Sequence, residues 1–219
     1  MFHWLEEFLM RKLIVLTFVS LDGIMQAPGG PAEDTSNGFA HGGWSVGYWD
    51  DTLSETMGEQ MGHPFDLLLG RKTYDIFASA WPTIDANSPI NSTRKYVVTH
   101  RPVPSDTPIW KNSIAISKNV PEEIRKIKNE NGNEIQVHGS SELIQTLLQN
   151  DLVDELWLKI YPCTLGKGKR LFGSGTIPAG FTLQSSKVSP SGVIIANYKR
   201  EGNIKSGTFT VEGEMQINE

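Results

Sequence analysis

The sequence predicts one α/β domain built around a mixed β-sheet. Over the first two thirds of the chain, short runs rich in β-branched residues alternate with segments whose apolar residues recur at helical spacing, as in parallel strands joined by helices. Two further apolar runs, residues 181–188 and 193–199, are separated by Ser-Pro-Ser-Gly, a hairpin signal. The sheet is therefore expected to end in an antiparallel pair. A chain of 219 residues can bury a core without disulfides or metals.

The strands before the hairpin are predicted from their content of Ile, Val, Leu, Thr and Phe. Residues 12–19 form the longest such run, as expected for a central strand that is buried on both faces. The predicted strands are residues 12–19, 67–69, 95–99, 113–117, 134–138 and 154–161.

The first helix is predicted over residues 50–62. Acidic and hydroxyl residues at its start can cap it. Leu53, Met57 and Met61 recur at helical spacing, and we expect them to form the stripe that faces the core.

The later helices follow strands. One begins at Gly70 and is expected to end at Pro82, before a polar loop over residues 83–93. Another is opened by Pro121, with acids in its first turn and lysines later, as the helix dipole favours. The last is predicted over residues 142–149.

The folded domain is expected to span residues 11–200. Residues 1–10 contain two glutamates in place of a basic segment, so we interpret them as an N-terminal extension and not as a secretory signal. Residues 201–219 alternate weakly between polar and apolar side chains, and they are interpreted as an edge strand or a C-terminal tail.

Composition narrows the class of ligand. The formal net charge of −5 argues against a broad surface for nucleic acid or anionic membranes, and no apolar run approaches the ~20 residues of a membrane span. Cys163 is the single cysteine, which excludes a disulfide framework and a cysteine-rich zinc site. We expect a cytoplasmic protein with no metal site and a small-molecule ligand.

A segment rich in Gly and Pro, residues 24–48, separates the first strand from the first helix. A loop of this length is unusual in a compact domain unless it is a lid or is disordered. It contains or adjoins four aromatic residues, which indicate that it folds down onto something. They are Phe39, Trp44, Tyr48 and Trp49.

The turn Gly70-Arg71-Lys72-Thr73 joins a buried strand to a helix. Cations at a helix start are unfavourable unless an anion lies between them and the unpaired backbone N–H groups. The turn therefore predicts a bound phosphate. The alternative is that Arg71 and Lys72 are solvated and that Gly70 only closes the strand.

Two more strand ends carry polar groups of the same kind. In each case a plain explanation exists: a solvated arginine in one, an ordinary serine N-cap in the other. Parallel strands place their carboxyl ends at one edge, however, where ligands of such sheets bind. Together with Gly70 they would suit an extended dinucleotide. The residues are Thr99, His100 and Arg101, and Gly139, Ser140 and Ser141.

Two further segments are candidates for contact with a ligand. Asp22 follows the first strand beside Gly23, although Asp-Gly is also an ordinary turn pair. Residues 165–172 form a basic, glycine-rich loop that lacks the Walker spacing.

In order along the chain, these segments resemble the dihydrofolate reductase-like superfamily. The nearest group includes the reductase domain of bacterial riboflavin-biosynthesis proteins and many stand-alone bacterial relatives. Each motif is short, but the ordered set is specific and runs from about Arg11 to Arg200. The motifs are Ser20-Leu21-Asp22-Gly23, Gly70-Arg71-Lys72-Thr73-Tyr74, Trp81-Pro82, Lys95-Tyr96-Val97-Val98-Thr99, Val137-His138-Gly139-Ser140-Ser141, Leu152-Val153-Asp154-Glu155-Leu156 and Leu165-Gly166-Lys167-Gly168-Lys169-Arg170-Leu171-Phe172.

The resemblance implies a single α/β domain with an eight-stranded mixed sheet flanked by helices, NADPH as cofactor, and a homodimer. Arg71, Lys72 and Thr73 would hold phosphates, and residues 99–101 would lie near the adenosine ribose, where Arg101 favours NADPH over NADH. Residues 139–141 and Leu143 would line the diphosphate and the nicotinamide.

The resemblance also gives two candidate catalytic residues. Asp22 corresponds to a substrate contact of the riboflavin group, and Asp51, or its neighbour Asp50, lies near the acid that dihydrofolate reductases place on the first helix. The basic loop, residues 167–170, would meet a substrate phosphate, form a packing turn or contribute to a dimer contact. One cysteine cannot supply a zinc deaminase module, so a bifunctional riboflavin enzyme is excluded.

The predicted function is hydride transfer from NADPH to a small heterocycle, of the pteridine or ribosylaminopyrimidine kind. The alternative is a nucleotide-binding protein of the same fold with little or no catalytic activity. A phosphate-handling transferase is less favoured, because neither a Walker loop nor an obvious metal-binding carboxylate cluster is present.

Overall fold

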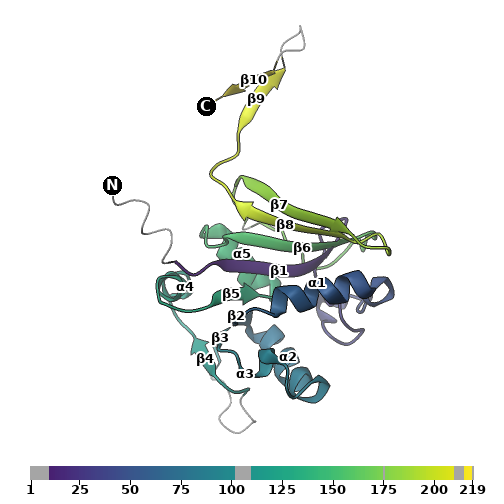
Figure 1. Ribbon diagram of the computed structural model, residues 1–219, viewed down its shortest axis with the longest axis vertical. Helices are drawn as coiled ribbons and strands as arrows, with labels where there is room; N and C mark the ends of the chain where they lie inside the picture. Colours follow the sequence, from purple (N-terminus) through teal and green to yellow (C-terminus); the bar gives the residue numbers. More distant parts are fainter. Residues whose placement is uncertain (1–9, 102–109, 175, 210–214, 219) are drawn as a thin grey trace.

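The computed structural model describes residues 10–101, 110–174, 176–209 and 215–218 of the chain. Its centre is an eight-stranded sheet with the order β4-β3-β2-β5-β1-β6-β8-β7, flanked by helices (Figure 1). The predicted fold class is therefore confirmed: a single α/β domain around a mixed sheet.

Parallel strands make up most of the sheet, and the antiparallel part is confined to one side. Strands β4, β3, β2, β5, β1 and β6 run parallel to one another, whereas β8 is antiparallel to both β6 and β7. The strands are β1 (Leu13–Ser20), β2 (Phe65–Gly70), β3 (Lys95–Val98), β4 (Ser113–Ile116), β5 (Glu134–Val137), β6 (Glu155–Tyr161), β7 (Phe181–Val188) and β8 (Ile194–Arg200).

Helices cover both faces of the sheet. Side chains alternate along β2, so that Leu68 packs in one hydrophobic cluster with α4 and α5, while Leu67 and Leu69 pack in another with α2. Both faces of the sheet at β2 are therefore apolar and covered. The helices are α1 (Asp51–Met61), α2 (Arg71–Ile84), α3 (Pro89–Ser92), α4 (Val120–Lys128) and α5 (Ser141–Gln149), with 3-10 turns η1 (Ser36–Gly38) and η2 (Val46–Tyr48).

The second helix is longer than the sequence indicated. It continues through Pro82 to Ile84, and the N–H of Asp85 donates to Trp81 O at 3.1 Å. Proline removes one backbone donor, but in the last turn this costs a single hydrogen bond and leaves the helix intact. The loop expected over residues 83–93 also contains the short helix α3.

The inward side of α1 is more polar than predicted. Leu53 is buried there, but the other buried residues are Thr56 and Gln60, whereas Met57 and Met61 are only partly buried. The reason lies in the sheet beneath α1, which presents polar side chains to the end of this helix.

The C-terminal segment forms strands outside the main sheet. β9 (Ser206–Phe209) pairs antiparallel with β10 (Met215–Asn218) in a separate two-stranded sheet, which projects beyond the end of β8 (Figure 1). The edge-strand interpretation therefore does not hold for the main sheet, whose edges are β4 and β7. The expected N-terminal extension lies outside the described residues, apart from Met10.

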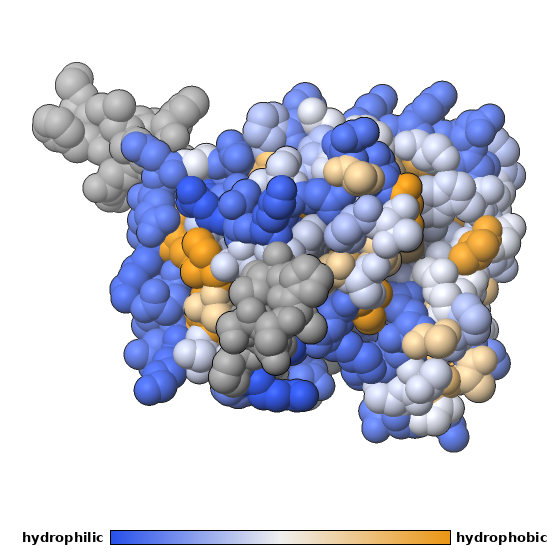
Figure 2. All heavy atoms as spheres, turned by 90° about the horizontal axis from the view of Figure 1, so that it is seen from below, coloured by the Kyte–Doolittle hydropathy of each residue, from blue (hydrophilic) through white to orange (hydrophobic). Residues whose placement is uncertain are grey.

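The surface at the β4 end is mainly hydrophilic. Figure 2 shows this face with small, separate hydrophobic patches among polar side chains. Among the described residues, no helix has the length and apolar character needed to cross a membrane.

Arg11 anchors the start of β1 to three neighbouring segments. It is 4% exposed, forms an ion pair with Asp66 at 2.5 Å, and donates to Asn133 O at 2.5 Å and to the Tyr96 hydroxyl at 3.4 Å. Asp66 is also buried. Removing one member of such a pair leaves a buried charge without its partner.

We expect Arg11→Met to lower the free energy of unfolding by about 3–5 kcal/mol, because Asp66 would remain buried without its counterion. Urea unfolding followed by circular dichroism measures the loss. The control is Lys12→Met, since the Lys12 side chain is 61% exposed in its pair with Glu155 and should contribute no more than about 1 kcal/mol. Equal losses in the two variants would contradict the assignment.

Candidate functional site

Three of the predicted strand ends lie side by side. Gly70 ends β2, Thr99 follows β3, and Gly139 follows β5 two residues after its last residue, Val137. Strands β3, β2 and β5 are adjacent and parallel. The three ends therefore share one edge of the sheet, as a parallel arrangement requires.

The turns after β2 and β5 are packed in direct contact. The Gly70 N–H donates to Gly139 O at 3.2 Å. A Cβ atom on Gly70 would lie 2.2 Å from Ser140 Oγ and 3.0 Å from its Cβ, and one on Gly139, whose φ is +149°, would lie 2.8 Å from Thr73 Oγ1. Glycine is needed at both positions because the two backbones approach so closely.

The helices that follow these turns begin without a side-chain cap. Gly70, the N-cap of α2, has no side chain, and Ser140, the N-cap of α5, makes no capping hydrogen bond. By contrast, Asp50 caps α1 by accepting from the Leu53 N–H at 3.0 Å. The capping explanation for Ser140 is therefore wrong. Two open helix N-termini on neighbouring strands form an arrangement that suits a diphosphate.

The side chains around these turns differ in their availability. Arg71 pairs with Asp75, one turn along α2, at 2.8 Å. Thr73 is partly buried and lies against Gly139. Leu143 is 4% exposed, and its side chain packs in the main core. Only its backbone, which lies in the first turn of α5, remains at the helix start.

The third strand end forms a tight turn of its own. The Thr99 hydroxyl donates to Arg101 O at 2.9 Å and accepts from the Arg101 N–H at 3.1 Å. Thr99 is buried, whereas His100 and Arg101 are exposed. The turn therefore presents the Arg101 guanidinium to solvent at the edge shared with Gly70.

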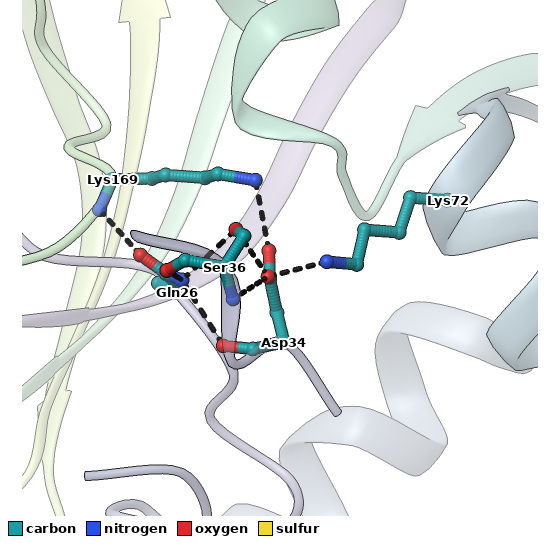
Figure 3. A network of polar contacts seen from close by, with 5 residues as sticks. All are labelled: Gln26, Asp34, Ser36, Lys72 and Lys169. Carbon is teal, nitrogen blue, oxygen red and sulfur yellow. Dashed lines mark hydrogen bonds and ion pairs between the residues drawn. The ribbon is translucent and has the colours of Figure 1, made fainter. Parts of the chain in front are cut away.

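Lys72 does not extend freely into solvent, because Asp34 of the loop before α1 binds it (Figure 3). The same carboxylate binds the Lys169 ammonium at 2.9 Å and accepts from the Ser36 N–H at 3.0 Å and its hydroxyl at 2.6 Å. The Gln26 amide donates to Asp34 O at 3.0 Å and accepts from the Lys169 N–H at 3.0 Å. Asp34 thus joins the loop, α2 and the basic loop.

The charge state of Asp34 follows from these contacts. Burial alone would raise its pKa, but hydrogen bonds from Lys169, Lys72 and Ser36 outweigh burial and lower the pKa far below its usual value of 3.8. Asp34 is therefore an anion that neutralises two lysines at the predicted phosphate site. Asp34 was not predicted as a site residue, although an acid in a loop near two basic segments is a signal that considerations of charge balance could have used.

Residues 24–48 fold down as the aromatic content indicated. Ile24, Ala27 and Phe39 form a small buried cluster, with Trp44 and Leu165 packed against it. The start of the loop also pairs with the basic loop through backbone hydrogen bonds of 2.9 Å on either side of the Ile24–Arg170 bridge. The loop is therefore a packed cover next to the shared edge.

Asp22 is held by the turn that it faces. Its carboxylate accepts from the Ser20 hydroxyl at 2.6 Å and from the backbone N–H groups of Leu165 and Gly166 at 3.1 and 2.8 Å. The hydrogen bond from Ser20 is the main cause of its lowered pKa. As an ionised acceptor that orients the basic loop, Asp22 has no proton to donate. Its predicted contact with the substrate stays a prediction.

Asp51 lies away from the sheet. It is exposed in the first turn of α1, and its neighbour Asp50 accepts from the backbone N–H groups of Leu53 and Ser191. The inward side of α1 therefore carries neither aspartate. A role for Asp51 as proton donor stays a prediction without support from its position.

A polar cluster that was not predicted from the sequence lies beneath α1. Lys159 is fully buried on β6 and donates to Gln60 Oε1. The Gln136 side-chain amide donates to Gln60 O at 2.8 Å, and the side-chain oxygen of Gln136 lies 3.1 Å from His138 Nε2. The signal was present: Lys159 is the one charged residue in the otherwise apolar run of residues 156–161, inside a predicted strand.

Two members of the cluster, Lys159 and His138, have lowered pKa values. Burial lowers the pKa of Lys159 to about 7, and burial together with the charge of Lys159 lowers the pKa of His138 to about 3. His138 also lies immediately before Gly139, with its ring 6.0 Å from that of Phe77 in α2. The cluster therefore reaches the turn that packs against Gly70.

A cavity of about 540 Å³ lies at the opposite end of the strands. Its lining comes from the starts of β2 and β4 and from the loops before β3 and β5, and it includes Asp66, Arg94 and Asn133. None of the predicted site residues lines this cavity. The chemistry at the carboxyl ends of the strands, and not this cavity, defines the candidate site.

Comparison with known families gives one match over most of the chain. The family described as RibD C-terminal domain matches residues 11–195. Two Bacillus subtilis (strain 168) proteins described as uncharacterized are similar to this chain. YyaP is 26% identical over 199 residues, which cover 88% of this chain and 96% of YyaP, and YwjB is 26% identical over 180 residues, which cover 81% and 91%.

Solved structures share the fold at low sequence identity. A protein from Shewanella sp. PV-4, named as a candidate riboflavin biosynthesis protein, aligns with a TM-score of 0.63 and 22% identity over 87% of this chain and 99% of its own. A pyrimidine reductase-like protein from Corynebacterium diphtheriae gives 0.58 and 14% over 88% and 93%. Dihydrofolate reductase from Enterococcus faecalis, in complex with NADP(H) and RAB-propyl, gives 0.55 and 14% over 86% and 96%.

We expect Asp34→Asn to lower the free energy of unfolding at pH 7 by about 1–3 kcal/mol, because two charge-assisted contacts are lost. A carboxylate whose pKa is lowered by folding stabilises the protein above its unfolded pKa and loses this contribution as the pH falls below that value, here 3.8. Thermal unfolding of wild type and variant should therefore converge below that pH.

The control for this prediction is Asp51→Asn, which removes an exposed acid from a helix start and should cost no more than about 1 kcal/mol. A loss for Asp34→Asn that stays constant down to pH 2 would show that the effect is not electrostatic.

Proposed function

Since the chain belongs to the RibD C-terminal domain family, we propose that it is an NADPH-dependent reductase that transfers hydride to a small heterocyclic substrate. One observation carries the proposal: two uncapped helix N-termini, those of α2 and α5, are held together at the edge where β2 and β5 end. A diphosphate is the group that such a pair of helix starts suits best.

The cofactor would lie along the edge formed by β3, β2 and β5. Backbone N–H groups at Arg71, Lys72 and Thr73 would bind phosphate from one side, and those of residues 139–141 and Leu143 from the other. Arg101 would contact a phosphate on the adenosine ribose, because it is the exposed cation of the adjacent strand end. This contact is the reason to propose NADPH and not NADH.

The protein itself would bind, orient and exclude water. When bound, a reduced nicotinamide supplies the hydride. The cover formed by residues 24–48 has its own buried cluster, and it would shield the reacting atoms from solvent. Binding of a phosphate by Lys72 would compete with its ion pair to Asp34.

A planar heterocycle is the proposed class of substrate. Phe18 is a partly exposed ring near the end of β1, and it packs against the exposed Trp49 at 5.9 Å and the buried Tyr161 at 5.6 Å. Such rings suit a flat aromatic ligand. The names of the structural neighbours, a pyrimidine reductase-like protein and a dihydrofolate reductase among them, favour a pyrimidine or a pteridine.

The second candidate is a nucleotide-binding protein with little or no catalytic activity. One observation favours it: Asp22 is engaged with backbone N–H groups and Asp51 faces solvent, so neither predicted acid is placed to supply a proton. NADPH consumption at its absorbance band, with dihydrofolate, pterins and ribosylaminopyrimidine phosphates as acceptors, separates this candidate from the reductase.

We further propose a cytoplasmic homodimer. Leu183, Val188 and Ile194 expose apolar side chains on the outer β7–β8 hairpin, which a second copy would cover. The single cysteine suits a reducing compartment. Sedimentation velocity measures the oligomeric state.

Titration of the protein with NADPH, NADH and ATP, followed by tryptophan emission, tests the cofactor. NADPH should bind more tightly than the other two, because it alone combines the diphosphate with a ribose phosphate and a nicotinamide. Failure to prefer NADPH would sink the reductase proposal, whatever the substrate.

Arg101→Ala should weaken the binding of NADPH by about tenfold and leave the affinity for NADH unchanged within about twofold. One charge-assisted contact contributes roughly 1.5–3 kcal/mol when well formed and less when exposed. The matched control is Arg94→Ala, an exposed arginine at the other end of β3, which should change neither affinity. Equal weakening of NADPH and NADH would refute a role for Arg101 at the ribose phosphate.

A further inference from the structure

Lys159 is a buried lysine with most of its hydrogen-bonding capacity unused. It is 0% exposed, and among the described residues its ammonium has one hydrogen-bond partner, the Gln60 side-chain oxygen. An ammonium group has three N–H donors. Within the part of the chain that the structure describes, Lys159 therefore lacks both a counterion and two of its three acceptors.

Other buried lysines of this protein are satisfied. Lys95 donates to three backbone carbonyl oxygens at 3.0, 2.8 and 3.0 Å, with its ammonium 4.2 Å from the centre of the Trp110 ring. Lys128 pairs with the Asp154 carboxylate at 2.6 Å and donates to a carbonyl at 3.0 Å. A buried cation without such partners is costly to stability. Lys159 therefore calls for an explanation other than packing.

A second polar group on the same face of β6 is also unmet. Tyr161, two residues after Lys159, is 0% exposed, and its hydroxyl has no hydrogen-bond partner among the described residues. The nearby Ser45 hydroxyl donates to Pro28 O at 2.8 Å instead. The Tyr161 ring is fixed by two loop residues, Trp44 at 5.2 Å and Tyr48 at 5.8 Å.

These two groups lie on the sheet face next to the proposed cofactor edge. Phe18 of β1 is the register partner of Lys159, and its ring is partly exposed. On the other side of β1, His138 belongs to the same polar cluster as Lys159 and precedes Gly139 of the turn after β5. A ring seated on Phe18 would lie between that turn and the two donors.

We propose that Lys159 and Tyr161 bind the oxygen or nitrogen atom of the C=O or C=N bond that is reduced, and that Lys159 delivers its proton. The inference rests on the proposed function. Both groups are donors, so they suit an acceptor atom. Hydride forms the new C–H bond, the π electron pair moves to the heteroatom, and the heteroatom takes a proton as a Lys159 N–H bond breaks. Water then returns a proton to the neutral amine, while the nicotinamide leaves oxidised by two electrons.

The titration of the two groups is compatible with these roles. Burial lowers the pKa of Lys159 to about 7, so that the ammonium can release a proton near neutrality. Burial raises the pKa of Tyr161 to about 12, which keeps its hydroxyl a donor. The groups that face Lys159 are His138 across β1, Tyr161 on its own strand and the uncharged Gln60 of α1.

The test that needs no substrate compares thermal unfolding of Lys159→Met with that of Lys128→Met. We expect Lys159→Met to melt at or above the wild-type temperature at pH 7, because it removes a buried cation without a counterion. A lysine whose pKa is lowered by folding destabilises the wild type below its unfolded pKa, 10.5, fully so at and below about pH 7. The advantage of the variant should therefore fade as the pH rises from 7 to 10.5. Lys128→Met should lower the melting temperature, since Asp154 loses its partner.

A melting temperature for Lys159→Met that falls as far as that for Lys128→Met would overturn the inference, because Lys159 would then be structural. NADPH titration of the same variant should give the wild-type affinity. If the wild type itself does not bind NADPH, the proposed function fails, and the unfolding comparison still decides whether Lys159 is structural.

With any acceptor that the wild type reduces, Lys159→Met should lower kcat about 100-fold or more, with the KM for NADPH unchanged. Tyr161→Phe should raise the KM for the acceptor while its melting temperature stays the same or rises. The wild-type rate should fall above about pH 7, and the residual rate of Lys159→Met should lose this dependence. Full activity in Lys159→Met would refute proton delivery while leaving the reductase assignment intact.

Discussion

The close packing of the β2–α2 turn on the β5–α5 turn is the constraint on which the rest of the site depends. Gly70 and Gly139 let the two backbones meet, with one hydrogen bond of 3.2 Å between them. Because β2 and β5 are parallel neighbours, this contact places two helix N-termini at one edge of the sheet. No side chain caps either helix, and we propose that both sets of N–H groups bind the same anion.

Lysines on the two sides of this edge differ in whether they have a counterion. On the loop side, Asp34 satisfies Lys72 and Lys169 within the protein itself, so the cover is attached by charge and a phosphate would compete for the same cation. Beneath α1, Lys159 has no counterion among the residues that the structure describes. The first arrangement contributes to stability, whereas the second costs stability, and we propose that it serves the reaction.

Much of the fold could be predicted from the sequence, because strand patterns, hairpin signals and strand-end glycines such as Gly70 are local features. Contacts between distant segments could not be predicted in this way. Asp34 lies 38 residues from Lys72, and Asp22 meets backbone N–H groups more than 140 residues away. The end of α2 was predicted too early, at Pro82, because a proline in the last turn of a helix removes only one hydrogen bond. The sequence shows Lys159 as a charged residue within an apolar strand, but only the structure shows that it has a single hydrogen-bond partner among the described residues.

Hydrogen exchange of backbone amides with and without NADPH tests whether the two helix starts bind one ligand. The first-turn N–H groups of α2 and α5 have no partner within their helices, so they should exchange rapidly in the free protein. We expect NADPH to slow exchange both in peptides that cover residues 71–73 and in peptides that cover residues 140–143. Protection of one turn alone, or protection confined to the segments around the cavity at the opposite end of the strands, would contradict it.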